Sequence, residues 1–165
     1  MIHANQQSSK KVQAMNKIDR FRGKNSFLSN FYPCIVEFDG KLYPSAEHAF
    51  QAAKTLDDDE RENFRVMDSP ATARYWGRRV NLRPDWDEVK LQVMRSIVEN
   101  KFTNEYNKQY HLDDMLRDTG TSYLEEGNNH SDKYWGTVNG EGQNHLGKIL
   151  MSVRDEISNN ENTLK

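Results

Sequence analysis

The sequence predicts a single α+β domain that is mostly helical and carries a small antiparallel sheet. A chain of 165 residues is long enough for one ordinary domain but too short for two of typical size. Short runs of β-branched and aromatic residues gather mainly in the first third of the chain, where turn signals separate them. Apolar residues at helical spacing, preceded by capping residues, occupy most of the remainder.

The strands are expected near the start of the domain. Residues 1–17 are rich in Asn, Gln, Ser and Lys, which predicts a flexible tail outside the fold. Two or three short strands are expected from residue 18 onward. The run 34–38 is followed by Asp39-Gly40 and then by residues 41–43, which is the pattern of a β-hairpin closed by a tight turn.

Three capped helices are expected after the hairpin. Ser45 can cap a helix that continues to about residue 56, because its hydroxyl accepts an otherwise unpaired backbone N–H. An acidic cluster begins a second helix over residues 58–67. Ser69 caps a third helix that runs through residue 78, with Pro70 in its first turn.

A long packing helix and a final helix complete the domain. Apolar residues recur mostly at helical spacing over 85–102, at Trp86, Val89, Val93, Ile97 and Val98. Next come a helix over 105–117, a strand over 122–125 and a polar, glycine-containing loop up to residue 144. The last helix is defined by Leu146, Ile149, Leu150, Val153 and Ile157. The domain is therefore expected to cover residues 18–160, with a short C-terminal tail at 161–165.

The composition excludes several classes of protein. Hydrophobic residues make up 35% and charged residues 29% of the chain, and no run approaches the roughly 20 apolar residues that span a bilayer. Cys34 is the sole cysteine, so an intramolecular disulfide and a multi-cysteine zinc site are excluded. The polar N-terminus is unlike an export signal, which makes the cytoplasm the expected compartment. A net charge of -2 predicts at most local contact with nucleic acid.

The helix after Ser45 offers the first candidate site. Glu47, Gln51 and Lys54 are four and three residues apart, so a carboxylate and an amine project from one face. Apolar residues cover the opposite side. From spacing alone, an ordinary amphipathic helix with a solvated face is the favoured interpretation.

The histidines do not predict a metal site. His48 has no second histidine three or four residues away, and His111, His130 and His145 are scattered. Each is better interpreted as a surface or hydrogen-bonding histidine.

The loop over residues 128–142 is a second candidate, with Asp132, Trp135 and Gly136 between clusters of Gly and Asn. A loop of this length in a compact domain is often functional. An equally good interpretation is a surface excursion whose aspartate caps a turn and whose tryptophan packs on the core. Both interpretations stay open.

The start of the last helix could bind phosphate. Gly140, Gly142 and Gly147 flank this start at Asn144, so a ligand could approach exposed backbone N–H groups there. The positive end of the helix dipole would favour an anion. A glycine-rich helix entry is a weak signal by itself.

A cluster of arginines and aromatic rings is a third candidate. It combines groups that pair with phosphate and rings that stack on a base: Arg74, Arg78, Arg79, Arg83, Tyr75, Trp76 and Trp86. The commoner outcome of such a pattern is that the aromatic rings fill the core while the arginines reach outward to solvent.

Over roughly residues 18–157 these segments together resemble the NADAR family of YbiA-like N-glycosidases. The matching motifs occur in order: residues 27–31 (FLSNF), 43–54 (YPSAEHAFQAAK), Gly77-Arg78, Trp86, Val93-Met94, Lys101-Phe102, 132–136 (DKYWG), 144–147 (NHLG) and Leu150-Met151. Several separated motifs in the right order are more specific than any single one.

The resemblance implies a YbiA-like fold and an N-glycosidase that acts on ribosyl substrates without cofactor or metal. It gives active-site roles to Glu47, Lys54, Asp132 and Trp86. The residues expected to contact substrate are Arg22, Ser29, Asn30, Phe31, His48, Gln51, Arg78, Trp86, Trp135, Gly136, Asn144 and Gly147. Glu47 is expected to stabilise positive charge at the ribose C1 and to activate water. Lys54 offers an alternative route through a Schiff base.

Three functions remain open. The leading hypothesis is removal of ADP-ribose from guanine, free or in nucleic acid, because the arginine and tryptophan cluster suits a diphosphate and a base. The alternative enzyme hydrolyses a ribosylaminopyrimidine phosphate of riboflavin biosynthesis. The third possibility is a noncatalytic module that binds NAD or ADP-ribose, which the reactive groups Glu47, Lys54 and Asp132 disfavour. No membrane partner is expected.

Overall fold

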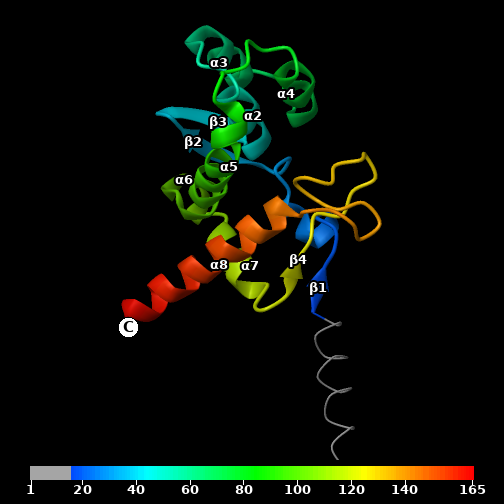
Figure 1. The fold of residues 1–165 in the computed structure, drawn as a ribbon. Coiled ribbons are helices and arrows are strands. Elements are labelled where there is room, and N and C mark those ends of the chain that lie inside the picture. The colour runs from blue at the N-terminus through cyan, green and yellow to red at the C-terminus, as the bar shows by residue number, and fades with distance from the viewer. Residues whose placement is uncertain (1–15) are drawn as a thin grey trace, which may run out of the picture.

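The computed structural model describes residues 16–165, so the expected tail falls outside it except for its last two residues. Lys17 belongs to the fold: strand β1 (Lys17–Ile18) pairs in parallel with β4 (Tyr123–Leu124). The predicted strand over 122–125 is therefore confirmed, but its partner comes from the edge of the expected tail. The domain begins at least one residue before the predicted boundary (Figure 1).

The predicted β-hairpin is confirmed. Strand β2 (Pro33–Phe38) pairs antiparallel with β3 (Lys41–Ser45). Asp39 and Gly40 form the turn with φ values of 47° and 77°, a left-handed conformation that aspartate tolerates and glycine favours. Before the hairpin, where the sequence predicted strands, residues Gly23–Leu28 instead form the 3-10 helix η1.

The first three helices follow the predicted order and pack around the hairpin. Helix α2 (Ala46–Ala53) begins directly after β3, α3 (Asp58–Arg65) follows, and α4 (Pro70–Gly77) comes third. The side chains of Ser45 and Ser69 each accept a backbone N–H from three residues on, as predicted for N-caps. Helix α2 contacts α3, α4, α5 and both strands of the hairpin, so it lies at the centre of this layer.

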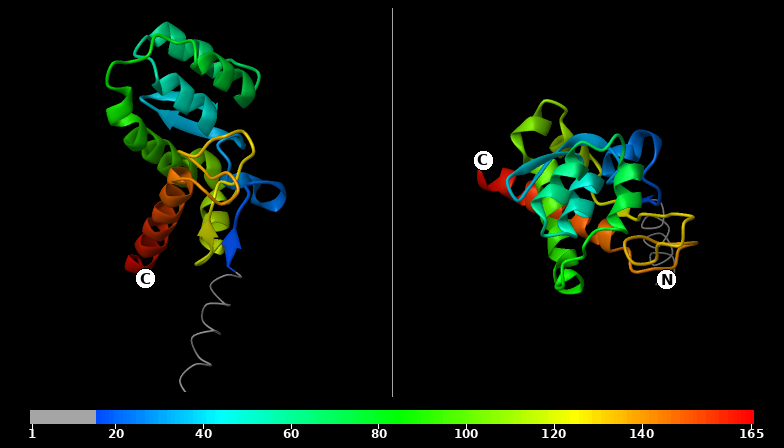
Figure 2. Two further views of the ribbon diagram at one scale, coloured as in Figure 1. Left: turned by 45° about the vertical axis from the view of Figure 1, so that its right-hand side comes forward. Right: turned by 90° about the horizontal axis from the view of Figure 1, so that it is seen from above.

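Two long helices complete the domain. Helix α5 (Trp86–Thr103) contacts β2, α2, α7 and α8, and its apolar face is buried, as predicted. Helix α8 (His145–Thr163) crosses α5 and includes the first three residues of the expected C-terminal tail (Figure 2). Within residues 16–165, no helix is long and apolar enough to cross a membrane.

The single helix predicted over 105–117 is wrong, because two short helices occupy this region. Helix α6 covers Glu105–Lys108 and α7 covers Leu112–Asp118. The break covers residues 109–111, and His111, with a left-handed φ of 57°, is the N-cap residue of α7. The buried Asn107 stabilises this turn from inside, since its amide donates to the carbonyl oxygens of Ile35 and Lys101 at 2.8 Å each.

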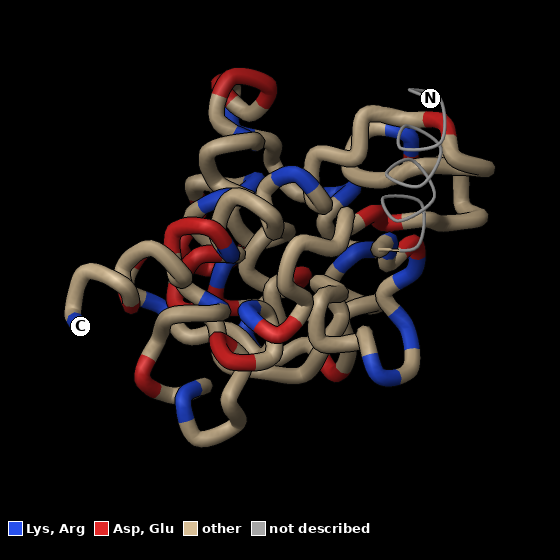
Figure 3. Tube along the Cα trace, turned by 90° about the horizontal axis from the view of Figure 1, so that it is seen from below, with Lys and Arg blue, Asp and Glu red and all other residues tan. Residues whose placement is uncertain are grey.

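Charged residues of both signs are interspersed around the described part of the chain, which agrees with the small net charge (Figure 3). A cationic surface for nonspecific binding along nucleic acid is not expected from such a distribution.

Candidate active site

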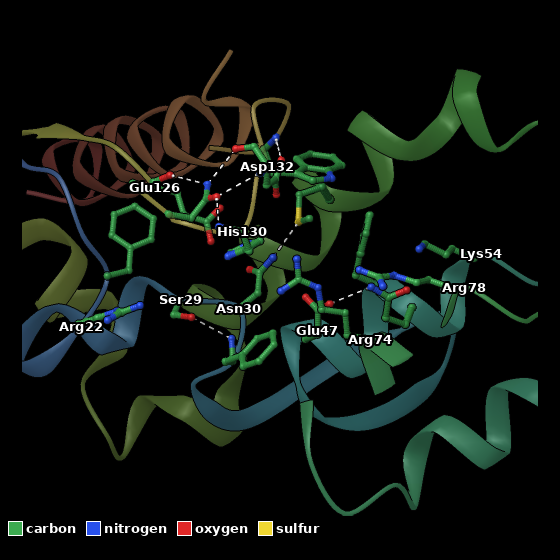
Figure 4. Close-up of a pocket in the computed structure, with 18 residues that line it drawn as sticks. Arg22, Ser29, Asn30, Glu47, Lys54, Arg74, Arg78, Glu126, His130 and Asp132 are labelled. Carbon is green, nitrogen blue, oxygen red and sulfur yellow. Dashed lines mark hydrogen bonds between the residues drawn. The ribbon is translucent and has the colours of Figure 1, made fainter. Parts of the chain in front are cut away.

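A cavity of about 490 Å³ opens between the helical layer and the loop before α8. Helices α2 and α4 form one wall, the segment around η1 forms a second, and the loop over 126–135 closes the third (Figure 4). The lining side chains are Phe21, Arg22, Ser29, Asn30, Phe31, Glu47, Phe50, Gln51, Lys54, Arg74, Arg78, Met94, Glu126, Asn128, His130, Asp132 and Trp135, together with Gly127. The helix face and the loop, two candidates from the sequence, thus share one cavity.

Glu47 lies in the first turn of α2 and projects into the cavity. Its side chain is 8% exposed, and its Oε1 accepts a hydrogen bond of 2.8 Å from Nε2 of Gln51, one turn along the helix. Burial raises the pKa of Glu47, while the Gln51 bond and the positive charges of Arg74 and Lys54 act in the opposite direction. The sequence spacing alone favoured a solvated helix face, and the structure instead buries this face against the cavity.

Lys54 lies at the C-terminal end of α2 and is half-buried. Burial lowers the pKa of its ammonium group, the Glu47 carboxylate opposes this shift, and Arg78 and Arg74 add to it. A lower pKa increases the fraction of neutral amine near pH 7, which is the form that attacks a carbonyl carbon.

The arginine cluster is divided by the structure. Arg74 and Arg78 line the cavity, whereas Arg79 stacks on the ring of Tyr75 at 3.7 Å and Arg83 forms an ion pair with Asp85. Tyr75 and Trp76 are exposed, so the interpretation that these rings fill the core is wrong, and neither ring lines the cavity.

Gly77 allows α4 to approach α2 closely. A Cβ atom at position 77 would lie 1.8 Å from Oε1 of Gln51. Its absence lets α4 bring Arg74 and Arg78 to the cavity beside Gln51.

Asp132 is held rigidly by the loop that carries it. Its Oδ1 accepts hydrogen bonds from the backbone N–H groups of Tyr134, at 3.1 Å, and Trp135, at 2.9 Å. Asn128 binds the backbone of the same residue from the other side, through its Oδ1 and its Nδ2. The interpretation of an aspartate that caps a turn is confirmed, and the functional interpretation of the loop stays a prediction, which the position of Asp132 in the cavity lining supports.

Ten of the predicted site residues line the cavity, and five do not. Those that line it are Glu47, Lys54, Asp132, Arg22, Ser29, Asn30, Phe31, Gln51, Arg78 and Trp135; the other five are His48, Trp86, Gly136, Asn144 and Gly147. His48 is buried in the helical layer, where its ring nitrogens bond to the hydroxyl of Ser45 and the carbonyl oxygen of Met67. His48 therefore does not line the cavity, and nothing in its surroundings supports the predicted contact with substrate.

Trp86 lies in the core beneath the cavity. It is 8% exposed and packs on Phe50 with ring centroids 5.2 Å apart, while Phe50 in turn contacts Trp135 at 5.3 Å. Trp135 lines the cavity and Trp86 does not, so the geometry favours Trp135 for the contact with substrate that was predicted for both.

This arrangement predicts different effects for the two tryptophans. Trp86→Phe is expected to lower the free energy of unfolding by about 1–2 kcal/mol through lost packing, with the affinity for ADP-ribose nearly unchanged. Trp135→Leu is expected to weaken that affinity about tenfold, because a base can stack only on a ring that reaches the cavity. Thermal unfolding and calorimetric titration of both variants check this, and unchanged stability with lost binding in Trp86→Phe would contradict it.

Gly136, Asn144 and Gly147 shape the wall of the cavity from outside it. The Asn144 side chain accepts from the backbone N–H of Glu126 at 3.0 Å and donates to the carbonyl oxygen of Leu124 at 2.9 Å. A Cβ atom on Gly136 would lie 2.1 Å from the carbonyl oxygen of Glu126, and one on Gly147 would lie 2.1 Å from that of Leu124. These three residues therefore fix the strand end, rather than the substrate, in place.

The start of α8 is not a free anion site. The backbone N–H groups of His145 and Leu146 donate to the carbonyl oxygens of Tyr134 and Trp135, at 3.2 and 3.0 Å. The prediction of phosphate binding there is wrong, because the loop already occupies these donors.

Glu126 is the main cavity residue that the sequence interpretation assigned to no candidate site, and Arg74 was assigned only to the arginine cluster. Glu126 follows β4, beside Glu125, which forms an ion pair of 3.0 Å with Lys17 outside the cavity. Alternation of side chains along an extended chain indicates that the two glutamates face opposite sides, although it does not say which one faces the cavity. Among residues 16–165, no group of three or more His, Cys, Asp and Glu side chains is arranged to hold a metal ion.

Comparisons with known proteins identify the family of this chain. The NADAR domain family matches residues 18–158. N-glycosidase YbiA of Shigella boydii is 39% identical over 134 residues, which cover 79% of this chain and 81% of that protein. An N-glycosidase of Nostoc punctiforme is 37% identical over 80% of this chain and 85% of its own length.

The fold comparison points the same way. The NMR structure of YbiA from Escherichia coli superposes with a TM-score of 0.72 at 33% identity, covering 90% of this chain and 92% of that one. The predicted YbiA-like α+β fold is confirmed. The chain therefore belongs to the NADAR family and, like these relatives, is an N-glycosidase-type hydrolase.

Proposed function

We propose that the protein hydrolyses the N-glycosidic bond between ADP-ribose and guanine, as a free nucleotide or in nucleic acid. One observation carries the proposal: a buried carboxylate, Glu47, lies in a cavity that also presents Arg22, Arg74, Arg78 and Lys54. The cations suit a diphosphate, and the cavity volume is in the range of sites for small ligands. The single cysteine accords with a reducing compartment such as the cytoplasm.

Cleavage of the bond develops positive charge at the ribose C1. A carboxylate close to that carbon stabilises the charge and can remove a proton from the attacking water. Glu47 suits this task because Gln51 fixes the orientation of its carboxylate, and because burial raises its pKa, which makes the carboxylate a stronger base. In the proposal, Asp132 orients the ribose hydroxyls and Trp135 stacks on the base.

The decisive experiment supplies two substrates separately. ADP-ribosylated guanosine and ribosylaminopyrimidine phosphate are incubated with the protein, and release of the base is followed by chromatography. Release from the first substrate alone supports the proposal, whereas release from the second alone rejects it. Calorimetric binding of ADP-ribose without release from either substrate would instead support a noncatalytic binding module.

The alternative substrate has one observation in its favour. A riboflavin biosynthesis protein of Vibrio vulnificus is 38% identical over 81% of this chain, although the match covers only 36% of that longer protein. A ribosylaminopyrimidine phosphate carries a single phosphate. It would therefore need fewer of the cations that line the cavity.

The two chemical routes differ in whether Lys54 forms a covalent bond. In the carboxylate route, reduction with borohydride during turnover is expected to leave Lys54 unmodified. A Schiff base to a ring-opened ribose would instead be trapped as a stable adduct. Mass spectrometry of the peptide that contains Lys54 makes the measurement, with Lys54→Arg as the control for adducts at other lysines. An adduct on Lys54 that is absent from the variant would overturn the carboxylate route.

A further inference from the structure

Glu126 lines the cavity on the wall that faces α2, and the route above gives it no task (Figure 4). Its backbone is fixed by two strong contacts. The N–H group donates to Oδ1 of Asn144 at 3.0 Å, and the carbonyl oxygen accepts from the N–H of Thr137 at 2.9 Å. A half-buried carboxyl group on so rigid a segment is suited to a task that depends on position.

The charges around Glu126 and Glu47 differ in sign. Glu47 accepts a hydrogen bond from Gln51 and has two cations nearby, Arg74 and Lys54. Glu126 is surrounded chiefly by negative charge, from Asp132 and Glu47, with Arg74 alone opposing it. Burial and these carboxylates raise the pKa of Glu126 to about 8. The neighbouring carboxylates thus favour the protonated form of Glu126, whereas the Gln51 hydrogen bond and the two cations favour the ionised form of Glu47.

We propose that Glu126 is the general acid of this site and delivers its proton to the departing base, an inference that rests on the proposed hydrolysis. The bond between the ribose C1 and the base nitrogen breaks, and its electron pair goes to the base, which takes the proton of Glu126. Water adds to C1, and its proton passes to Glu47. Transfer of that proton through solvent to Glu126 restores both groups, and the net reaction consumes one water.

Other charged groups around the cavity bear on the pH dependence of this step. Asp132 and His130 come from the loop, Glu47 and Lys54 from α2, Arg74 and Arg78 from α4 with its C-cap, and Arg22 from the segment before η1. Burial and the charge of Arg74 lower the pKa of His130, which makes it a poor proton donor at neutral pH. Glu126 is therefore the acid expected to shape the alkaline side of the pH profile.

The test compares Glu126→Gln with wild type from pH 5 to 10, using ADP-ribosylated guanosine. The kcat of Glu126→Gln is expected to fall about 100-fold or more at pH 7. Wild type is expected to lose activity as pH rises past about 8, where Glu126 gives up its proton. This alkaline loss is expected to be absent from Glu126→Gln. Glu125→Gln is the matched control, because the Glu125 carboxylate pairs with Lys17 outside the cavity. The kcat of this control should stay within about twofold of wild type.

A second measurement does not depend on turnover. Difference infrared spectra at pH 7 should show a protonated carboxyl band in wild type and Glu125→Gln that is missing from Glu126→Gln. Wild-type kinetics retained by Glu126→Gln, or a band that persists in it, would overturn the assignment of Glu126. If wild type releases no guanine, the proposed function is rejected instead. The infrared band then still decides whether Glu126 holds the proton.

Discussion

Glu47→Gln is expected to lower kcat about 1000-fold or more while leaving the fold intact. The amide has the shape of the carboxylate, so it can still accept the hydrogen bond from Gln51 in the buried first turn of α2. However, it carries no negative charge to stabilise the developing cation at C1, and it cannot take a proton from water. Steady-state release of the base from the preferred substrate makes the measurement.

Two controls separate this loss from a structural defect. Affinity for ADP-ribose, measured by calorimetry, should change only a few-fold, and Glu99→Gln, which alters an exposed carboxylate on α5, should leave kcat unchanged. Turnover retained by Glu47→Gln would remove the carboxylate from the mechanism.

The stability of Glu47→Gln should depend on pH in a defined direction. The folded-state pKa of Glu47 lies above its unfolded value, so wild type loses stability as pH rises above that unfolded value. Glutamine does not titrate. The melting temperature of the variant minus that of wild type should therefore increase between pH 4 and 8. A constant difference over this range would contradict the raised pKa of buried Glu47.

Local sequence signals predicted most of the helices and the hairpin. Ser45 and Ser69 cap helices through contacts within three residues, and the Asp39-Gly40 turn needs only its own left-handed backbone. Signals of this kind act over a few residues and can be recognised in the chain. Pairing of Lys17 with Tyr123 joins segments more than 100 residues apart, which no local pattern specifies.

The candidate site was predictable where it lies on a helix and less so where it depends on long-range packing. Helical spacing placed Glu47, Gln51 and Lys54 on one face, and the cavity contains all three. Glu126 was missed because only the position of β4 against α8 decides which of two adjacent glutamates faces the cavity. The glycine at 147 was interpreted as access for a ligand, although the same absence of a side chain serves close packing.

Gly147→Ala is expected to destabilise the protein by about 3 kcal/mol or more. A methyl group at this position would lie 2.1 Å from the carbonyl oxygen of Leu124 and about 2.4–2.5 Å from the side-chain amide of Asn144. Helix α8 must therefore move away from β4, or the Asn144 amide must release its bonds. Chemical denaturation measures the loss in free energy of unfolding.

Gly140→Ala is the matched control, because it makes the same substitution in the loop that precedes α8. Gly140 has a φ of 80°, and a Cβ atom there would meet nothing within 4 Å, so only backbone strain of about 1 kcal/mol is expected. The difference between the two variants isolates the contact of α8 with β4. Equal losses would show that this close approach contributes nothing to stability.

Gly147→Ala should also lower catalytic activity, because the side-chain oxygen of Asn144 accepts a hydrogen bond from the backbone N–H of Glu126. Displacement of α8 would shift the Glu126 carboxyl group in the cavity, and a misplacement of about 1 Å can cost about 100-fold in rate. At a temperature where Gly147→Ala remains folded, kcat should thus fall well below that of Gly140→Ala. Affinity for ADP-ribose should change much less, because the proposed function assigns it largely to Arg74, Arg78 and Lys54 on the opposite wall. Wild-type kcat in a destabilised Gly147→Ala would mean that the strand end and its glutamate hold their position without α8.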